Sequence, residues 1–207
     1  MRIVSWNPDV ISLNEIDNET QGTTILNYLR TKTGANWVSK YDGRGNMVLS
    51  KLSRTTDSVC VTNTSVGRKA AHLGVLVNGR PLNVWSGHFA LDSSAMRTAE
   101  AVALQACEAL YPEARLAAMD FNAQPYTAEY NSMLKGHTDA WVSAPVKSNY
   151  AGNCDGCTRN SRIDYIWTSR NASYLTLASV QIFDTRNASG VMPSDHKPML
   201  VVYNVAP

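Results

Sequence analysis

The chain has 207 residues, of which 44% are hydrophobic and 17% are charged, and its formal net charge is +2. This length and apolar content exclude a disordered chain and suit a domain that buries a sizeable core. The balance of 19 basic and 17 acidic residues excludes a histone-like polycation and a strongly acidic solvating chain. The sequence has no run of 18 apolar residues, so we expect no membrane-spanning helix.

Residue patterns in the first half of the chain predict mostly strands. Residues 20–32 have apolar side chains at helical spacing and predict a helix. Asn78 and Gly79 form a strong signal for a two-residue hairpin turn. Strands are expected at residues 2–6, 9–13, 46–50, 58–63, 70–77 and 82–88.

The second half predicts one long helix and further strands. Ser93 and Ser94 are N-cap candidates for a helix that reaches Leu110, and Pro112 ends it. Strands are expected at residues 115–119, 163–168, 175–183 and 198–204. We find no repeat, low-complexity tract or linker, so residues 1–207 are expected to form a single domain. Many strands with few helices predict an α+β fold in which helices lie outside packed sheets.

Acids, amides and histidines occur where the predicted strands begin or end. A single polar residue at a strand end is usually a cap or a turn residue, so only the combination is informative. Strand ends at one rim of a sheet can converge on a single cleft. Oxygen ligands there suit a hard cation such as Mg²⁺, and histidines suit proton transfer near neutral pH. The residues concerned are Asn7, Glu15, His88, Asp120, Asn122, Asp164, Asp195 and His196.

The segments around these residues have a characteristic order. They are Ser5-Trp6-Asn7, Leu13-Asn14-Glu15-Ile16-Asp17, Ser86-Gly87-His88, Asp120-Phe121-Asn122, Arg162-Ile163-Asp164-Tyr165 and Ser194-Asp195-His196-Lys197-Pro198. In this order they resemble the motifs of the endonuclease/exonuclease/phosphatase superfamily, over nearly the whole chain. The resemblance implies a deoxyribonuclease-I-like fold, a four-layer sandwich of two mostly antiparallel β-sheets flanked by helices.

The resemblance also implies a metal-dependent attack of water on a phosphate ester. Glu15 is then the principal ligand of Mg²⁺, for which Mn²⁺ is a possible substitute. Asn7 and Asp195 assist Glu15, directly or through water. Such a displacement needs a neutralised phosphate, an activated nucleophile and help for the leaving oxygen.

The remaining motif residues receive roles in proton transfer and in positioning. His196 is implied to be a general base or an electrostatic clamp on the phosphate, and Asp164 to orient its ring. Asp120 and Asn122 are implied to position the attacking water and a phosphate oxygen. His88 is implied to bind phosphate or to protonate the leaving oxygen.

Two positions depart from the family pattern. Met119 occupies the place of the usual Gly before Asp-Phe-Asn, which narrows the space beside the site. Pancreatic-type deoxyribonucleases pair the histidine at the position of His88 with a Glu from an Arg-Glu dipeptide, whereas this chain has Arg68-Lys69. A general-acid role for His88 therefore lacks its usual acidic partner.

The junction between Asn7 and Pro8 is a larger anomaly. Family members have a helix of some two dozen residues at this point, whereas here the two predicted strands abut. Parallel strands need a crossover of about a dozen residues, so residues 2–6 and 9–13 cannot pair in parallel. Either a segment is missing between Asn7 and Pro8, which we favour, or the helix is deleted and the sheet edge is rebuilt.

The four cysteines fall into two pairs of different character. Cys60 lies in a strand-like run and Cys107 in a helix-like run, and both are predicted to be buried thiols. For Cys154 and Cys157 we favour a local disulfide over free thiols or a zinc knuckle. A disulfide implies an oxidising compartment, so we expect a secreted protein whose leader is absent from this sequence, with a cytoplasmic location as the alternative.

The substrate stays open at this stage. The superfamily cleaves DNA, RNA, nucleotides, phosphoinositides and sphingomyelin. We favour a nuclease, with Arg159 and Arg162 as the candidates that bind a phosphate backbone. A phosphatase or phosphodiesterase for small molecules or lipids is the alternative, and a non-catalytic phosphate-binding module is a third reading. A monomer is expected.

Overall fold

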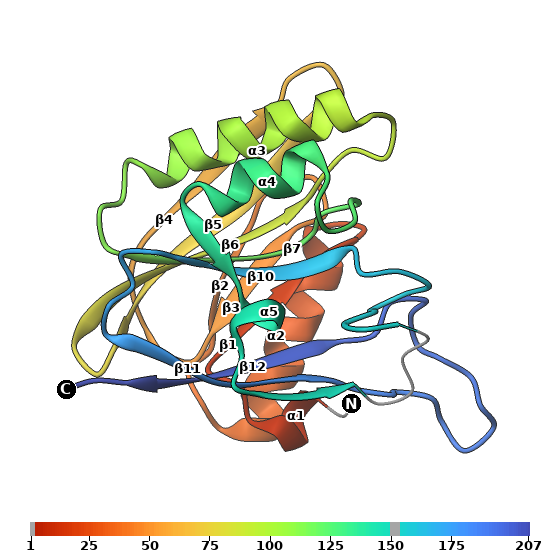
Figure 1. The fold of residues 1–207 in the computed structure, drawn as a ribbon. Helices are drawn as coiled ribbons and strands as arrows, with labels where there is room; N and C mark the ends of the chain where they lie inside the picture. Colours follow the sequence, from red (N-terminus) through yellow and green to blue (C-terminus); the bar gives the residue numbers. More distant parts are fainter. Residues whose placement is uncertain (1–2, 150–153) are drawn as a thin grey trace.

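The computed structural model describes residues 3–149 and 154–207, and its largest element is a six-stranded sheet (Figure 1). All neighbouring strands in this sheet are antiparallel except β6 and β7, which run parallel. The spatial order is β4 (Ser53–Asn63), β5 (Arg68–Val77), β6 (Arg80–His88), β7 (Ala114–Asp120), β10 (Asp164–Ser169) and β8 (His137–Asp139).

Two three-stranded sheets make up the second strand layer. One has the order β1 (Val10–Leu13), β3 (Met47–Ser50) and β2 (Val38–Tyr41). The other has the order β12 (Met199–Val205), β11 (Leu175–Ile182) and β9 (Val146–Asn149). A buried cluster that contains Val48, Leu73 and Val84 joins this layer to the six-stranded sheet.

Helices cover both outer faces, as the α+β prediction requires. Helices α3 (Ser94–Glu108) and α4 (Ala128–Leu134) lie side by side over the six-stranded sheet, and α2 (Glu19–Thr33) lies beside β1 and β3 (Figure 1). Two short helices, α1 (Ile3–Trp6) and α5 (Ala140–Ser143), complete the set. Among the described residues, no helix has the length and apolar content needed to cross a bilayer.

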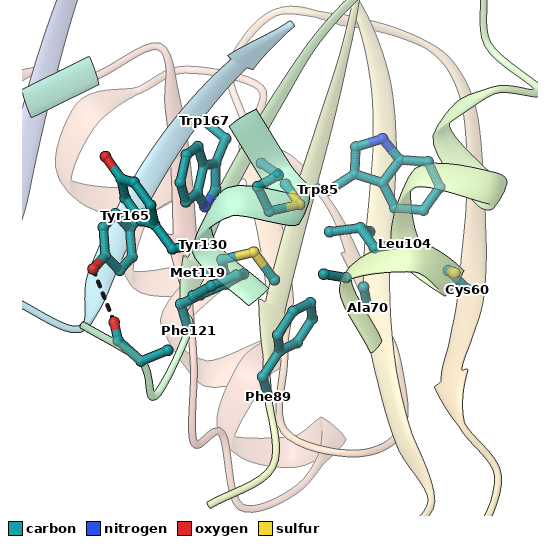
Figure 2. Close-up of a cluster of buried hydrophobic side chains, with 14 residues drawn as sticks. Cys60, Ala70, Trp85, Phe89, Leu104, Met119, Phe121, Tyr130, Tyr165 and Trp167 are labelled. Atoms are coloured by element: carbon teal, nitrogen blue, oxygen red, sulfur yellow. Dashed lines mark hydrogen bonds between the residues drawn. The ribbon is translucent and has the colours of Figure 1, made fainter. Parts of the chain in front are cut away.

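An aromatic core beneath α3 and α4 holds the strands that carry the polar residues (Figure 2). Tyr165 and Trp167 of β10 stack with ring centroids 5.0 Å apart, and Phe121 packs edge-on against Tyr165. The Tyr165 hydroxyl donates a hydrogen bond to the Ala123 carbonyl oxygen at 2.8 Å. The loop after β7 is therefore fastened to β10 from inside the core.

Capping and turn residues in the sequence predicted several helix and strand ends correctly. The Ser93 hydroxyl accepts a hydrogen bond from the Met96 amide and caps α3. Asn78 and Gly79 have φ angles of 50° and 78°, which suit the tight hairpin between β5 and β6. The prediction missed β2, β8, β9, α4 and α5, and it began β4 five residues too late.

The predicted strand at residues 2–6 was wrong over its described part, because Ile3–Trp6 form a helix. Asn7 follows in a left-handed conformation, with φ of 48°, and leads through Pro8 directly into β1. So short a link cannot carry a parallel strand to the edge of β1. The interpretation that a segment is missing between Asn7 and Pro8 stays a prediction.

A cavity of about 860 Å³ lies where the two small sheets fail to join. Val10 and Leu13 of β1 line it from one side, and Val201 and Tyr203 of β12 from the other. Within the described residues, β1 and β12 each pair with one strand only, so each has an edge without a partner strand. The second layer is therefore two half-sheets rather than one continuous sheet.

The structure contains two disulfides within its described residues. Cys60 of β4 is bonded to Cys107 of α3, with Cα atoms 6.1 Å apart, so the prediction of two thiols was wrong. A strand residue and a helix residue 47 positions apart face each other only through tertiary packing, which no local pattern reveals. The structure also pairs Cys154 with Cys157, as favoured from the sequence.

We expect the Cys60→Ala/Cys107→Ala variant to lose about 4 kcal/mol of unfolding free energy, because the bond closes a long loop in the unfolded chain. Denaturant unfolding under non-reducing conditions measures this loss. The Cys154→Ala/Cys157→Ala variant is the control, and its short loop predicts a loss of less than about 2 kcal/mol. Equal losses in the two variants would contradict the explanation by loop length.

Candidate active site

Three titratable side chains lie side by side at the ends of three neighbouring strands in the middle of the six-stranded sheet. We call these three residues the row. His88 is the last residue of β6, Asp120 the last of β7, and Asp164 the first of β10. In register, His88 lies opposite Asp120 on the parallel side, and Asp164 lies opposite Asp120 on the antiparallel side. Directly opposed residues on neighbouring strands point to the same face, so the row is set by strand pairing alone.

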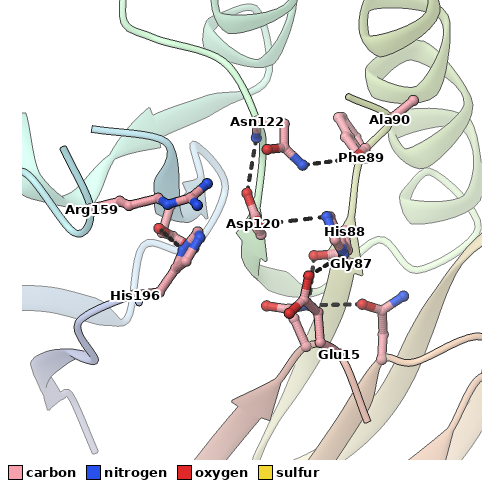
Figure 3. A network of polar contacts seen from close by, with 12 residues as sticks. Glu15, Gly87, His88, Phe89, Ala90, Asp120, Asn122, Arg159 and His196 are labelled. Atoms are coloured by element: carbon pink, nitrogen blue, oxygen red, sulfur yellow. Dashed lines mark hydrogen bonds and ion pairs between the residues drawn. The ribbon is translucent and has the colours of Figure 1, made fainter. Parts of the chain in front are cut away.

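His88 lies between two carboxylates (Figure 3). Its Nε2 atom is 3.5 Å from Asp120 Oδ2, and its Nδ1 atom is 4.0 Å from Glu15 Oε1. Burial is the main cause that lowers the pKa of His88, and the charge of Arg68 lowers it further. The lowered pKa favours the neutral form of the His88 imidazole.

Asp120 is the most perturbed acid of the row. Burial, followed by the charge of Asp164, raises the pKa of Asp120 to about 6. The negative charge of Glu15 also raises the pKa of Asp120, so the carboxylates of Asp164 and Glu15 both repel that of Asp120. The backbone amide of Asn122 partly offsets this by donating to Asp120 Oδ1 at 3.1 Å.

Hydrogen bonds of the Asn14 side chain hold the backbone next to Glu15 close to the row. The Asn14 side-chain amide donates to the Gly87 carbonyl oxygen and to Asn46 Oδ1, both at 2.8 Å. The end of β1 is thereby tied to the residue before His88. Glu15 follows with φ of 58°, and its side chain is 75% exposed, so its carboxylate stays accessible from the solvent.

Two serines join the layers beneath the row. The Ser12 hydroxyl donates to the Ala118 carbonyl oxygen at 2.8 Å, and the Ser86 hydroxyl donates to the Leu13 carbonyl oxygen at 3.0 Å. These bonds link β1 to β6 and β7 across the interior. The backbone of Glu15, two residues after the end of β1, is therefore held near His88 and Asp120.

His196 approaches the row from the segment before β12. Its Nδ1 atom is 2.8 Å from Asp164 Oδ2, and its backbone amide donates to Ser194 Oγ at 3.1 Å. The hydrogen bond to Asp164 is the main cause that raises the pKa of His196. This pairing is the one that the sequence resemblance implied for the two residues.

Asn122 is held by backbone contacts at the end of β7. Its φ angle is 50°, and its side-chain amide donates to the Phe89 carbonyl oxygen at 2.9 Å. The Phe89 amide in turn donates to the Asp120 carbonyl oxygen at 3.0 Å. The segments after β6 and β7 are thus locked together beside the row.

Four other predicted site residues are not brought into this cluster. Asn7 lies at the start of β1, whereas Glu15 follows its end, and Asn7 Oδ1 accepts a hydrogen bond from Lys51. The carboxylate of Asp195 is paired with Arg159 at 2.7 Å, and both side chains are largely exposed.

Arg162 was expected to bind substrate, but the structure buries it. Its guanidinium pairs with Asp139 at 2.8 Å and lies against the rings of Tyr130 and Tyr165. A side chain that is 6% exposed and neutralised by a buried acid has no face left for a phosphate. Its contacts make Arg162 a structural residue behind the site.

Sequence reasoning missed the two asparagines that position Glu15. Asn46 binds Asp42 through its amide at 2.6 Å and accepts the hydrogen bond from Asn14. The position of Asn14 inside a recognised motif, next to Glu15, was the one sign in the sequence that Asn14 could have a role in the site. Asn46 precedes β3 and carries no local sign of its contact with Asn14, which is 32 positions away.

The donors of this cluster fit a hard divalent cation. Ligand atoms of Asp120, Asp164 and His196 all lie within 4.8 Å of one another, and Glu15 lies on the other side of His88. Asp120 is buried, and the charges of Asp164 and Glu15 help to raise its pKa, so a bound cation would stabilise its ionised form. Oxygen donors match the preference of Mg²⁺.

We expect Asp120→Asn to stabilise the metal-free protein at pH 7.5 by about 1–3 kcal/mol and to leave its stability at pH 4 unchanged. The folded-state pKa of Asp120 is raised, so its favourable contribution is present at low pH and is lost as the pH rises through about 6. Denaturant unfolding in EDTA across this pH range measures the difference. Parallel pH profiles of the two proteins would contradict the assigned pKa.

The fold matches solved structures at low sequence identity. A Bacteroides vulgatus endonuclease/exonuclease/phosphatase has a TM-score of 0.77 at 16% identity, and the match covers 98% of this chain and 87% of that one. D. rerio TDP2 in complex with a single-strand DNA product has a TM-score of 0.74 at 16% identity, covering 98% and 88%. A Bacteroides thetaiotaomicron mannosyl-6-phosphatase has a TM-score of 0.71 at 16% identity, with the same coverage.

These likenesses concern the fold, and the sequence supplies the family. No curated protein matches the sequence. The model of the Endonuclease/Exonuclease/phosphatase family matches residues 2–196, which is nearly the whole chain. The matched region includes every residue of the strand-end row together with Glu15 and His196. The chain belongs to the endonuclease/exonuclease/phosphatase family.

Proposed function

We propose that this protein is a divalent-metal-dependent phosphodiesterase that cleaves nucleic acid by attack of water on a backbone phosphate. One observation carries the proposal, namely the row of His88, Asp120 and Asp164 with His196 bonded to Asp164. This row combines a neutral imidazole, an imidazole oriented by an acid and a set of mutually repelling carboxylates.

Asp164 and His196 form the proton-transfer pair. Asp164 binds the Nδ1 side of the ring, so the Nε2 side is directed to the phosphate or to the attacking water. A pKa raised by Asp164 makes His196 a stronger base and a better electrostatic clamp. Both implied roles of His196 are compatible with this geometry.

His88 is assigned to binding rather than to acid catalysis. Its burial favours the neutral ring, and a neutral imidazole donates a hydrogen bond to a phosphate oxygen without delivering a proton. Asp120 fixes the ring from one side, and Asn122 holds the Asp120 carboxylate through its backbone amide. In this assignment Asp120 and Asn122 position His88, whereas the resemblance implied that they position the attacking water and a phosphate oxygen.

The carboxylates of Glu15, Asp120 and Asp164 are proposed to hold Mg²⁺, with Mn²⁺ as a substitute. The bound cation supplies charge neutralisation at the phosphate and lowers the pKa of a water molecule. Asp195 and Asn7 are not included among these ligands. The carboxylate of Asp195 is paired with Arg159 and could bind the cation only if that ion pair broke. Asn7 precedes the first residue of β1, whereas Glu15 follows its last residue.

Two features near the row favour a nucleic-acid substrate. Tyr126 follows the Asn122 loop with φ of 70° and is 84% exposed, so its ring is available to stack on a base. Arg159 is partly exposed, and its guanidinium could bind a neighbouring phosphate on leaving its ion pair with Asp195. The structural neighbour D. rerio TDP2 was solved in complex with a single-strand DNA product, which supports this proposal.

The apolar cavity supports a second candidate function. It extends from Glu15, Asp164 and His196 to Val10, Val201 and other apolar residues between the two half-sheets. An amphiphilic phosphate ester would place its phosphate at the row and its hydrocarbon chain in this cavity. A lipid phosphoesterase is therefore the alternative that the assays below must separate from a nuclease.

A secreted location is part of the proposal. The support for it is the presence of two disulfides, which persist in oxidising compartments.

We expect His196→Ala to reduce Mg²⁺-dependent nicking of plasmid DNA by roughly 10²-fold or more, because the oriented base is lost. The parent protein should nick the plasmid with Mg²⁺ and not with EDTA. Undiminished nicking by the variant would remove His196 from the mechanism. No nicking by the parent, together with release of phosphate from a lipid phosphate ester, would favour the second candidate.

We expect Glu15→Ala to raise the Mg²⁺ concentration needed for half-maximal nicking by roughly 10-fold or more, since one carboxylate ligand is removed. A Mg²⁺ titration of the nicking rate measures this change. Glu19→Ala is the matched control, because Glu19 begins α2 and lies away from the row. An unchanged Mg²⁺ requirement in the Glu15 variant would exclude Glu15 from the ligand set.

A further inference from the structure

Thr158 contacts both halves of the Asp164–His196 pair. Its hydroxyl donates a hydrogen bond to Asp164 Oδ2, the same oxygen atom that lies 2.8 Å from His196 Nδ1. Its carbonyl oxygen accepts a hydrogen bond from the backbone amide of Lys197 at 2.7 Å. One residue therefore fixes the rotamer of the acid and the backbone next to the imidazole.

The segment that carries His196 depends on this contact. Residues 193–198 form neither helix nor strand, so regular hydrogen bonding does not hold them. On the C-terminal side of His196, the nearest backbone hydrogen bonds run from Lys197 to Thr158 and from Phe183 to the carbonyl oxygen of Pro198, whereas on the N-terminal side the nearest one ends at the carbonyl oxygen of Val191. Without the Thr158 contact, the segment would be held by the bond of His196 to Asp164, the Ser194 turn, the exposed Arg159–Asp195 ion pair and the bond from Phe183 to Pro198.

Thr158 is itself rigidly supported. It is completely buried and directly follows Cys157, which is also buried and is bonded to Cys154. The turn between the cysteines packs on Trp141 and Arg162, since a Cβ atom at Gly156 would meet Arg162 Cδ at 2.6 Å. The Trp141 indole also donates to Asp155 Oδ1 at 3.0 Å.

We propose that Thr158 is a positioning residue for the Asp164–His196 pair and that the Cys154–Cys157 disulfide serves as its anchor. The hydroxyl holds Asp164 Oδ2 in the orientation that binds His196, and the carbonyl oxygen holds the chain beside His196. This inference rests on the proposed phosphoesterase function, and it gives a role to the disulfide and to the buried Arg162 behind it.

The test compares Thr158→Val, which removes the hydroxyl and keeps the shape, with Thr158→Ser, which keeps the hydroxyl. With bis-p-nitrophenyl phosphate and Mg²⁺, we expect the Val variant to lose about 10-fold or more in kcat with little change in KM. The Ser variant should stay within about 3-fold of the parent kcat. Thr138→Val is the matched control, because the Thr138 hydroxyl bonds the Thr168 carbonyl oxygen at the edge strand β8.

A second readout does not depend on activity. The ring N–H proton of His196, identified by its loss in His196→Ala, should give a downfield proton resonance in the parent and in Thr158→Ser. It should shift or broaden in Thr158→Val, and also in Cys154→Ala/Cys157→Ala if the disulfide is the anchor. If the parent hydrolyses no phosphate ester, the proposed function fails while this resonance still tests the positioning.

Two results would overturn the inference. One is a Thr158→Val protein that keeps both the kcat and the His196 resonance of the parent. The other is a Thr158→Ser protein that loses as much as the Val variant, since that would assign the effect to packing and not to the hydroxyl. If Thr158→Val fails to fold, the cysteine double variant decides, and an unchanged His196 resonance there contradicts the anchoring role.

Discussion

The register of three neighbouring strands is the constraint on which the rest of the structure depends. Pairing of β6, β7 and β10 places His88, Asp120 and Asp164 in one row, where burial and mutual repulsion raise the pKa of Asp120 to about 6. Such a row is unfavourable for an isolated fold, because buried like charges destabilise one another. A bound cation would relieve this cost and would then attract an anionic substrate, so the arrangement is understandable as a binding site.

The surrounding layers keep that row in place. The aromatic cluster under α3 and α4 fastens the loop after β7 to β10, and the serine and asparagine bonds tie β1 to β6 and β7. Other contacts hold His196, namely the hydrogen bonds of Thr158 and the turn between Cys154 and Cys157, which packs on Arg162. The site is therefore assembled from two independently anchored halves, one in the sheet and one in the loops before β10 and β12.

Much of this arrangement could be predicted from the sequence, and the failures have physical reasons. The strand-end positions of the acids follow from local patterns, whereas the Asp164–His196 pair was implied by the resemblance to the family motifs. The structure buries Arg162 because the segment before β10 turns its side chain towards Asp139, and a motif does not reveal such a contact between distant residues. Ile3–Trp6 have strand-forming residues, but the short link through Pro8 gives them no parallel partner, so tertiary connectivity overrides the local preference. Contacts between distant residues, such as the Cys60–Cys107 bond, leave no local pattern.

The central claim is that the carboxylates around this row hold a divalent cation. Anomalous diffraction from a crystal soaked in Mn²⁺ tests it most directly, with an EDTA-treated crystal as the reference. The account predicts one strong anomalous peak within about 2.3 Å of oxygen atoms from at least two of Glu15, Asp120 and Asp164. A peak bound only by other residues, or the absence of a peak at saturating Mn²⁺ in a crystal with an intact row, would contradict it.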